Sequence, residues 1–192
     1  DEFLRRELVS KITQAAERYA PSNSWFLKTT TKVLQLGGDL VSPEVAYHLI
    51  RLIAEGTGED EEEDMDLRRE AVLLYLSLLA GLHEKELTAL PRVLVQVVTW
   101  VLGEYGYLGA ASGEVAIENI SNTLCDLAER QFASAEERGW AISAVLKLAA
   151  QAGALPPRAV AVCQRYKASL DTDLQQRCRE GLKLAAKPAI LA

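Results

Sequence analysis

The residues best placed to do chemistry in this 192-residue sequence are carboxylates, seven of which lie in the eight positions from Glu59 to Asp66. Such a run could bind a cation. A calcium loop, however, alternates its ligands and has a glycine at the bend. Here the acids from Glu59 to Asp64 are contiguous, and no glycine lies among them. We therefore expect a solvated, mobile loop between two helices, with contact to a basic partner surface as the alternative.

The histidines and cysteines do not form a recognisable site. His48 and His83 are the only imidazoles, and neither has a second His or a Cys near it in sequence, so structural roles are expected. The cysteines, Cys125, Cys163 and Cys178, are odd in number and lack the short spacing of metal sites. They are predicted to be free buried thiols in a reducing compartment.

Motifs for catalysis are also missing from the sequence. No HExxH, GxSxG or P-loop string occurs. Gly56 and Gly58 flank a turn, but the acids that follow would repel a phosphate. The sequence thus predicts no enzyme, no cofactor and no catalytic, cofactor-binding or metal-binding residue. An all-α enzyme that uses the carboxylates of the acidic run is the alternative from another class.

The charge balance narrows the class of partner. The net charge is -6, and the seven acids of the run account for all of the excess, since the rest sums to +1. A nearly neutral body argues against a nucleic-acid groove and against a polybasic lipid patch. No secretory signal and no apolar run of about 18 residues is found, so no membrane span is expected. The sequence lacks an initiator Met, and we expect a fragment of a longer protein.

Apolar residues recur every three or four positions along most of the chain, which predicts helices and no strand. Ser134 and Glu137 form a capping box, and Asp171 or Thr172 caps the last helix. The predicted helices span 1–19, 23–36, 43–56, 66–80, 90–105, 114–131 and 134–148, with two more opening at 156 and 171.

Glycines and tryptophans are given packing roles. Gly103, Gly106 and Gly109 are interpreted as the end of the helix over 90–105, although a glycine inside a helix also suits a close helix neighbour. The tryptophans are expected to pack between repeats, with interface hot spots as the alternative. They are Trp25, Trp100 and Trp140.

The helices pair, with first members beginning near residues 1, 43, 90 and 135. A step of about 45 residues is typical of HEAT and armadillo units. The predicted fold class is all-α, a right-handed superhelical α-solenoid of HEAT/armadillo-like helix pairs, in which stacked neighbours bury a continuous core. A compact helical bundle is the structural alternative.

Several strings carry a resemblance to a known family. They are LRRELVSKI at 4–12, AERYAPSNSWF at 16–26, GGDLVSPEVAYHLIRLIAEG at 37–56, WVLGEYG at 100–106 and DLQQRCREGL at 173–182. With these strings the chain resembles the adaptin trunk over nearly its whole length. The SNTLCDLAE string at 121–129 and the acidic run favour the epsilon class of adaptor protein complex four. The chain departs from other adaptins in the length of the Glu59 to Asp66 run and in the Ala-rich stretch from Gly109 to Ala116.

The resemblance implies a function that the residues alone do not give. Residues 1–192 would be a single segment of the adaptin N-terminal trunk, with about four to five helical repeats. The protein would be the scaffold of a heterotetrameric vesicle-coat adaptor that sorts transmembrane cargo. Its implied partners are a beta-type large adaptin, a medium and a small subunit, and an Arf-family GTPase, but no nucleic acid.

The resemblance also implies a place in the cell. The protein would be cytoplasmic and peripheral on trans-Golgi network or endosomal membranes, through its complex and without spanning the bilayer. It identifies no partner-interface residue. A coatomer large subunit or a nuclear transport receptor is the alternative scaffold.

Overall fold

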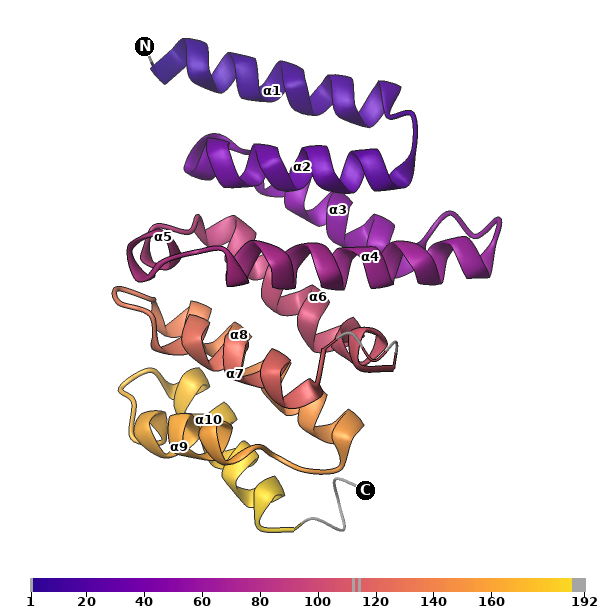
Figure 1. The fold of residues 1–192 in the computed structure, drawn as a ribbon. Coiled ribbons are helices and arrows are strands. Elements are labelled where there is room, and N and C mark those ends of the chain that lie inside the picture. Colours follow the sequence, from indigo (N-terminus) through magenta and orange to yellow (C-terminus); the bar gives the residue numbers. More distant parts are fainter. Residues whose placement is uncertain (1, 112, 114, 188–192) are drawn as a thin grey trace.

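The computed structural model describes residues 2–111, 113 and 115–187, and every regular element in those ranges is a helix (Figure 1). The predicted all-α class is confirmed. The helices in chain order are α1 Glu2–Tyr19, α2 Asn23–Gly37, the 3-10 helix η1 Gly38–Leu40, α3 Pro43–Glu55, α4 Glu61–Ala80, α5 Glu84–Thr88, α6 Arg92–Ala111, α7 Ile117–Glu129, α8 Ala135–Ala152, α9 Pro157–Tyr166 and α10 Thr172–Ala185.

The helices stack in two layers, with α1 and α10 at opposite ends of the stack (Figure 1). One layer runs α2, α4, α7, α9 and the other α3, α6, α8, α10, and each helix contacts the next one in its own layer. Each also contacts a partner across the layers, in the pairs α2 with α3, α4 with α6, α7 with α8 and α9 with α10. This elongated stack agrees with a helical solenoid rather than a compact bundle.

The predicted spacing is visible in the second layer. Helices α3, α6 and α8 begin at residues 43, 92 and 135, close to the predicted starts at 43, 90 and 135. The predicted caps are present as well: Ser134 Oγ accepts from the Glu137 amide at 3.2 Å, and an Asp171 carboxylate oxygen accepts from the Leu174 amide at 2.8 Å. Each cap satisfies an amide that the first helical turn would leave unpaired.

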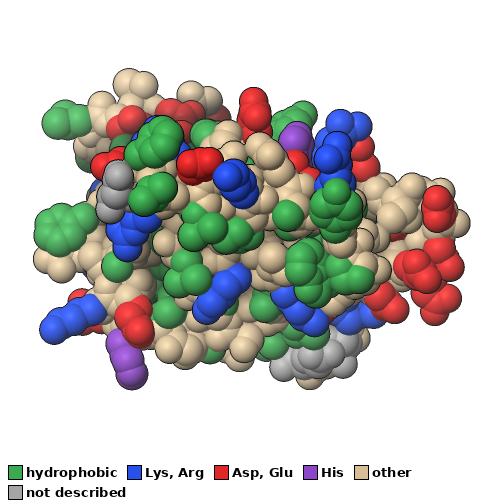
Figure 2. Space-filling model, turned by 90° about the horizontal axis from the view of Figure 1, so that it is seen from above, with side chains coloured by type: hydrophobic (Ala, Val, Ile, Leu, Met, Phe, Trp, Pro, Cys, Tyr) green, Lys and Arg blue, Asp and Glu red, His purple; other side chains and the backbone are tan. Residues whose placement is uncertain are grey.

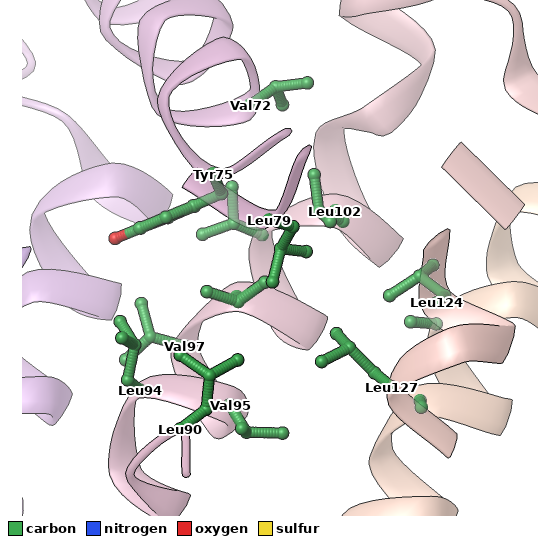
Figure 3. Packing of buried hydrophobic residues seen from close by; sticks show 14 of the residues in the cluster. Val72, Tyr75, Leu79, Leu90, Leu94, Val95, Val97, Leu102, Leu124 and Leu127 are labelled. Carbon is green, nitrogen blue, oxygen red and sulfur yellow. The ribbon is translucent and has the colours of Figure 1, made fainter. Parts of the chain in front are cut away.

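One continuous apolar core runs along the stack from α1 to α10. Figure 3 shows its centre, where α4, α6 and α7 meet. Tyr75 is fully buried there, and its hydroxyl lies 3.2 Å from Thr31 Oγ1, so its polar group keeps a partner. Burial raises the pKa of Tyr75 well above its ordinary value. The centre of the core includes Val72, Leu79, Leu94, Leu102, Leu124 and Leu127 (Figure 3).

Helix α6 corrects the prediction that Gly103, Gly106 and Gly109 end it near residue 105. It continues to Ala111 because its glycines lie where other helices touch it. A Cβ on Gly103 would lie 2.8 Å from the Cα of Ala144 in α8, and one on Gly106 would lie 2.8 Å from a methyl of Leu148. The other interpretation of these glycines, close approach of a neighbouring helix, is the correct one.

Helix α6 is also the most apolar element of the stack. Among the described residues it alone is long and apolar enough to cross a membrane by length and composition. The helix contains no unbroken apolar run of about 18 residues, because Gln96, Thr99 and Glu104 interrupt it. For this reason the sequence did not predict a possible membrane span here. In the fold, 61% of its most apolar 18-residue window is buried, as expected for the core helix of a stack.

Two smaller differences concern the connections. The five-residue helix α5, Glu84–Thr88, was not predicted. Helix α7 runs over Ile117–Glu129 instead of 114–131, and the predicted start at Glu114 lies outside the described residues. In the described part of the Gly109 to Ala116 stretch, residues 109–111 belong to α6.

Candidate interaction surfaces

The acidic run is not the loop that the sequence predicted. Helix α4 begins at Glu61, so most of the run forms its first turns. Asp60 is the N-cap, and its side chain accepts from the Glu62 amide at 2.8 Å. Negative charge is stabilised at a helix N-terminus by the helix dipole, which explains why the crowded carboxylates do not prevent the helix from forming.

One acid of the run is buried and structural. Asp64 accepts hydrogen bonds from the backbone amides of Thr57 and Gly58, at 2.8 and 3.2 Å, and so holds the turn between α3 and α4. The Thr57 amide is the main cause that lowers the pKa of Asp64. Gly56 closes the turn with a φ of 66°, and a Cβ there would lie 2.1 Å from the Asp64 carboxylate.

Arg68 completes the same corner from the next turn of α4. Its guanidinium donates to the carbonyl oxygens of Ile53 and Ala54, at 3.0 and 2.8 Å, and so caps the C-terminus of α3. The guanidinium also lies 5.4 Å from the ring centroid of Tyr105 in α6. The corner is therefore a built connection, with its exposed carboxylates at the right-hand tip of the molecule in Figure 2.

A pocket lies between α3, α6 and α8. Trp100 and Trp140, for which packing roles were predicted, line this cavity of about 160 Å³ together with Ile50. Its polar residues include Gln96 and Lys147. Both tryptophans are half-buried and pack against the core. Their expected packing role is confirmed. The cavity leaves part of each ring open to a ligand or partner.

The third tryptophan and the histidines lie apart from this pocket. Trp25, in the first turn of α2, is 42% exposed. His48 Nδ1 lies 2.8 Å from a carboxylate oxygen of Glu17, which joins α3 to α1. The backbone amide of His83 donates to Glu86 at 2.9 Å at the start of α5. Among the described residues, no group of three or more His, Cys, Asp or Glu could hold a metal ion.

A buried ion pair that has no counterpart among the predicted site residues joins the end of α7 to α8, to α5 and to the connection between α5 and α6. Arg130 donates to the carbonyl oxygens of Leu87 and Leu90, at 3.0 and 3.2 Å, and to the carboxylate of Glu137. Both charged side chains are less than 10% exposed. Burial would raise the pKa of Glu137, but the hydrogen bonds from Ser134 and the Arg130 charge lower it below its ordinary value. The only signal in sequence was the Glu of the capping box.

The outer face of α1 carries the apolar stripe that predicted this helix. Only Thr13 and Ala16 of α1 are buried, and they lie beside the stripe, on the side of the helix that packs toward α2. Figure 2 looks onto the α1 end and shows hydrophobic side chains with Lys and Arg between them. The large exposed apolar residues of α1 are Phe3, Leu4, Leu8, Ile12 and Tyr19.

Comparison with known proteins agrees with this architecture. The two-layer stack of helix pairs defines a helical-repeat protein. The model of the adaptin N-terminal region matches residues 1–189. The chain therefore belongs to the adaptin family.

Sequence identity to individual adaptins indicates which adaptin class the chain is similar to. The chain is 39% identical to the AP-4 complex subunit epsilon of Arabidopsis thaliana over 98% of its length, and 37% identical to the human AP-4 complex subunit epsilon-1 over 94%. It is 30% identical to the human AP-1 complex subunit gamma-like 2 over 92%. The similarity to AP-4 epsilon subunits confirms the predicted epsilon resemblance. The chain spans 20%, 15% and 22% of these relatives' own lengths.

Proposed function

We propose that this chain is a trunk segment of a large subunit in a vesicle adaptor complex of the AP-4 type, and that its work is scaffolding. The observation that carries the proposal is the adaptin match over residues 1–189 together with the identity to AP-4 epsilon subunits. The two-layer stack supports it, since stacked repeats offer long surfaces to partner proteins.

The finer parts of the proposal follow from the family. Residues 1–192 form one segment of a right-handed solenoid of about four to five repeats. The parent protein joins a beta-type large adaptin, a medium subunit and a small subunit, and an Arf-family GTPase recruits the complex to trans-Golgi network or endosomal membranes. The protein has no enzymatic activity of its own, and membrane attachment is peripheral, through the complex.

Affinity capture from cytosol tests the proposal. The full-length parent is used as bait beside the 192-residue chain, and bound proteins are identified by mass spectrometry. Recovery of a second large adaptin with a medium and a small chain supports the adaptor function. Recovery of coatomer or nuclear-transport components without adaptor chains contradicts it. Recovery by the 192-residue chain of one of the chains that the parent captures would show that this segment makes that contact.

A second experiment tests whether the exposed acids of α4 form a contact surface for a partner. The variant Glu61→Gln/Glu62→Gln/Glu63→Gln neutralises three exposed acids in the first turn of α4 but leaves Asp60 and Asp64 in place. We expect capture of the adaptor chains to be retained, with a small loss of stability from the weaker helix-dipole interaction. Loss of capture with an unchanged circular dichroism spectrum would instead make the acidic turn a contact surface.

A further inference from the structure

Two buried thiols face each other at the contact between α9 and α10. Cys163 lies on α9 and Cys178 on α10, and both are free and almost fully buried. The two helices pack directly on each other, and the thiols are close enough to shift each other's pKa. Gly181, one turn after Cys178, shows the same approach: a Cβ there would lie 3.5 Å from the sulfur of Cys163. The helix α10 thus turns its Cys178 to Gly181 face toward the Cys163 thiol.

The third cysteine is the competing partner. Cys125 on α7 lines a small cavity together with Cys163, so the test must exclude a bond between these two. Burial raises the pKa of Cys125 to about 12, and Cys125 therefore holds little of the reactive thiolate. Cys163 and Cys178 shift each other's pKa, and either of them can start the reaction as its thiolate.

We propose that Cys163 and Cys178 are a redox pair, which hydrogen peroxide converts into a disulfide that joins α9 to α10. The sulfur of one thiolate of the pair attacks one peroxide oxygen; an S–O bond forms, the O–O bond breaks, and the departing hydroxide takes up a proton to become water. The sulfur of the other thiol then attacks the sulfenic sulfur. The S–S bond forms, the S–O bond breaks, and a second water leaves with the proton of the second thiol.

Peroxide alone balances the electrons of this reaction, and the fold determines how peroxide reaches the two sulfurs. The two thiols lose two electrons in total, and the peroxide takes up both. Peroxide reaches the buried sulfurs when α9 and α10 separate locally, so reaction is slower than for an exposed thiol. A disulfide across this contact removes freedom from the unfolded chain, and we expect it to raise the Tm by roughly 5 °C.

Thiol counting after oxidation tests the pair. The chain is treated with hydrogen peroxide, then unfolded and alkylated, and its intact mass is measured with and without a reductant. We expect one alkylated cysteine out of three, a mass loss of about 2 Da before alkylation, and a linked peptide that contains Cys163 and Cys178. The Tm of the oxidised chain should rise and should return after reduction.

Matched variants make the outcome decisive. Cys125→Ala should keep the disulfide, and both Cys163→Ala and Cys178→Ala should abolish it. If either of these two variants fails to fold, peptide mapping of the unaltered chain still decides. Three alkylated thiols after peroxide treatment, a link that includes Cys125, or a link only between two chains would overturn the proposal.

Discussion

The centre of the stack and its α1 end use the same kind of residues in opposite ways. In α6 the valines and leucines meet α4, α7 and α8, and all of them except Val93 are buried. In α1 an equally regular apolar stripe is exposed, with Leu8 at 59%. Periodicity therefore shows where a helix forms and which face is apolar. Whether that face is covered depends on the neighbours that the stack supplies.

Removal of Arg130 should have the largest effect on the central region. Arg130→Met leaves the buried carboxylate of Glu137 without its cation, and we expect a loss of about 3 to 5 kcal/mol of unfolding free energy. Denaturant unfolding followed by circular dichroism measures it. The double variant Arg130→Met/Glu137→Met should recover a large part of the loss. Equal stability of the two variants would mean that the unpaired charge is not the cause.

A side chain on Gly103 should be the next most damaging change. Gly103→Val forces a Cβ against the backbone of Ala144, and we expect a loss of about 2 to 3 kcal/mol in the same measurement. The control is Gly139→Ala, where the nearest side-chain atom is at 3.6 Å. That change should be neutral or stabilising by about 1 kcal/mol through helix propensity. Similar losses in both variants would contradict the close contact of α6 with α8.

Acid should weaken the central region through its paired carboxylates. The pKa values of Asp64 and Glu137 are lowered in the folded state, by the Thr57 amide and by the bonds from Ser134 and Arg130. Their stabilisation is therefore complete above the ordinary carboxylate pKa of about 4 and is lost as the pH falls through the folded values. Below about pH 4, the denaturant concentration at the midpoint of unfolding should decrease as the pH falls. The decrease should be less steep in Glu137→Gln. Curves of equal slope for the unaltered chain and for Glu137→Gln would show that Glu137 does not contribute to the loss of stability in acid.

The exposed face of α1 should be the most tolerant. Leu8→Gln is expected to change the unfolding free energy by less than about 0.5 kcal/mol, because Leu8 is already in water. The same change should reduce self-association at high concentration, measured by sedimentation velocity, since it interrupts the apolar stripe. A loss of several kcal/mol would show that this face is covered within the chain. The buried control on the same helix is Ala16→Gln, which should destabilise the contact with α2.

The sequence predicted the helices well where caps and periodicity agree. Ser134 with Glu137, and Asp171, set helix starts that the structure reproduces, because a cap is a local interaction between residues three apart. The acidic run was misassigned since charge crowding suggests a loop. In the fold, the dipole of α4 and the amides of Thr57 and Gly58 stabilise the carboxylates.

The remaining features depend on contacts between distant residues. In sequence, Gly103 is compatible with a helix end and with close contact to a neighbouring helix. Only the position of Ala144, about 40 residues later, decides between the two. The pocket at Trp100 and Trp140 likewise needs the packing of α6 on α8. Arg130 carries no local mark of burial, because its partners Leu87 and Leu90 come from the preceding repeat.

Helix α6 sets a timing problem for the growing chain. It has the length and composition of a membrane span, and its cover is completed by α8, which ends roughly 40 residues later. At the usual rate of synthesis that interval is about 2 to 8 s. During that time the most apolar segment of the protein has the earlier helices α2, α3 and α4 to pack against, but not the complete α8. Slow synthesis just after residue 111 would therefore favour aggregation or misdirected membrane insertion over folding.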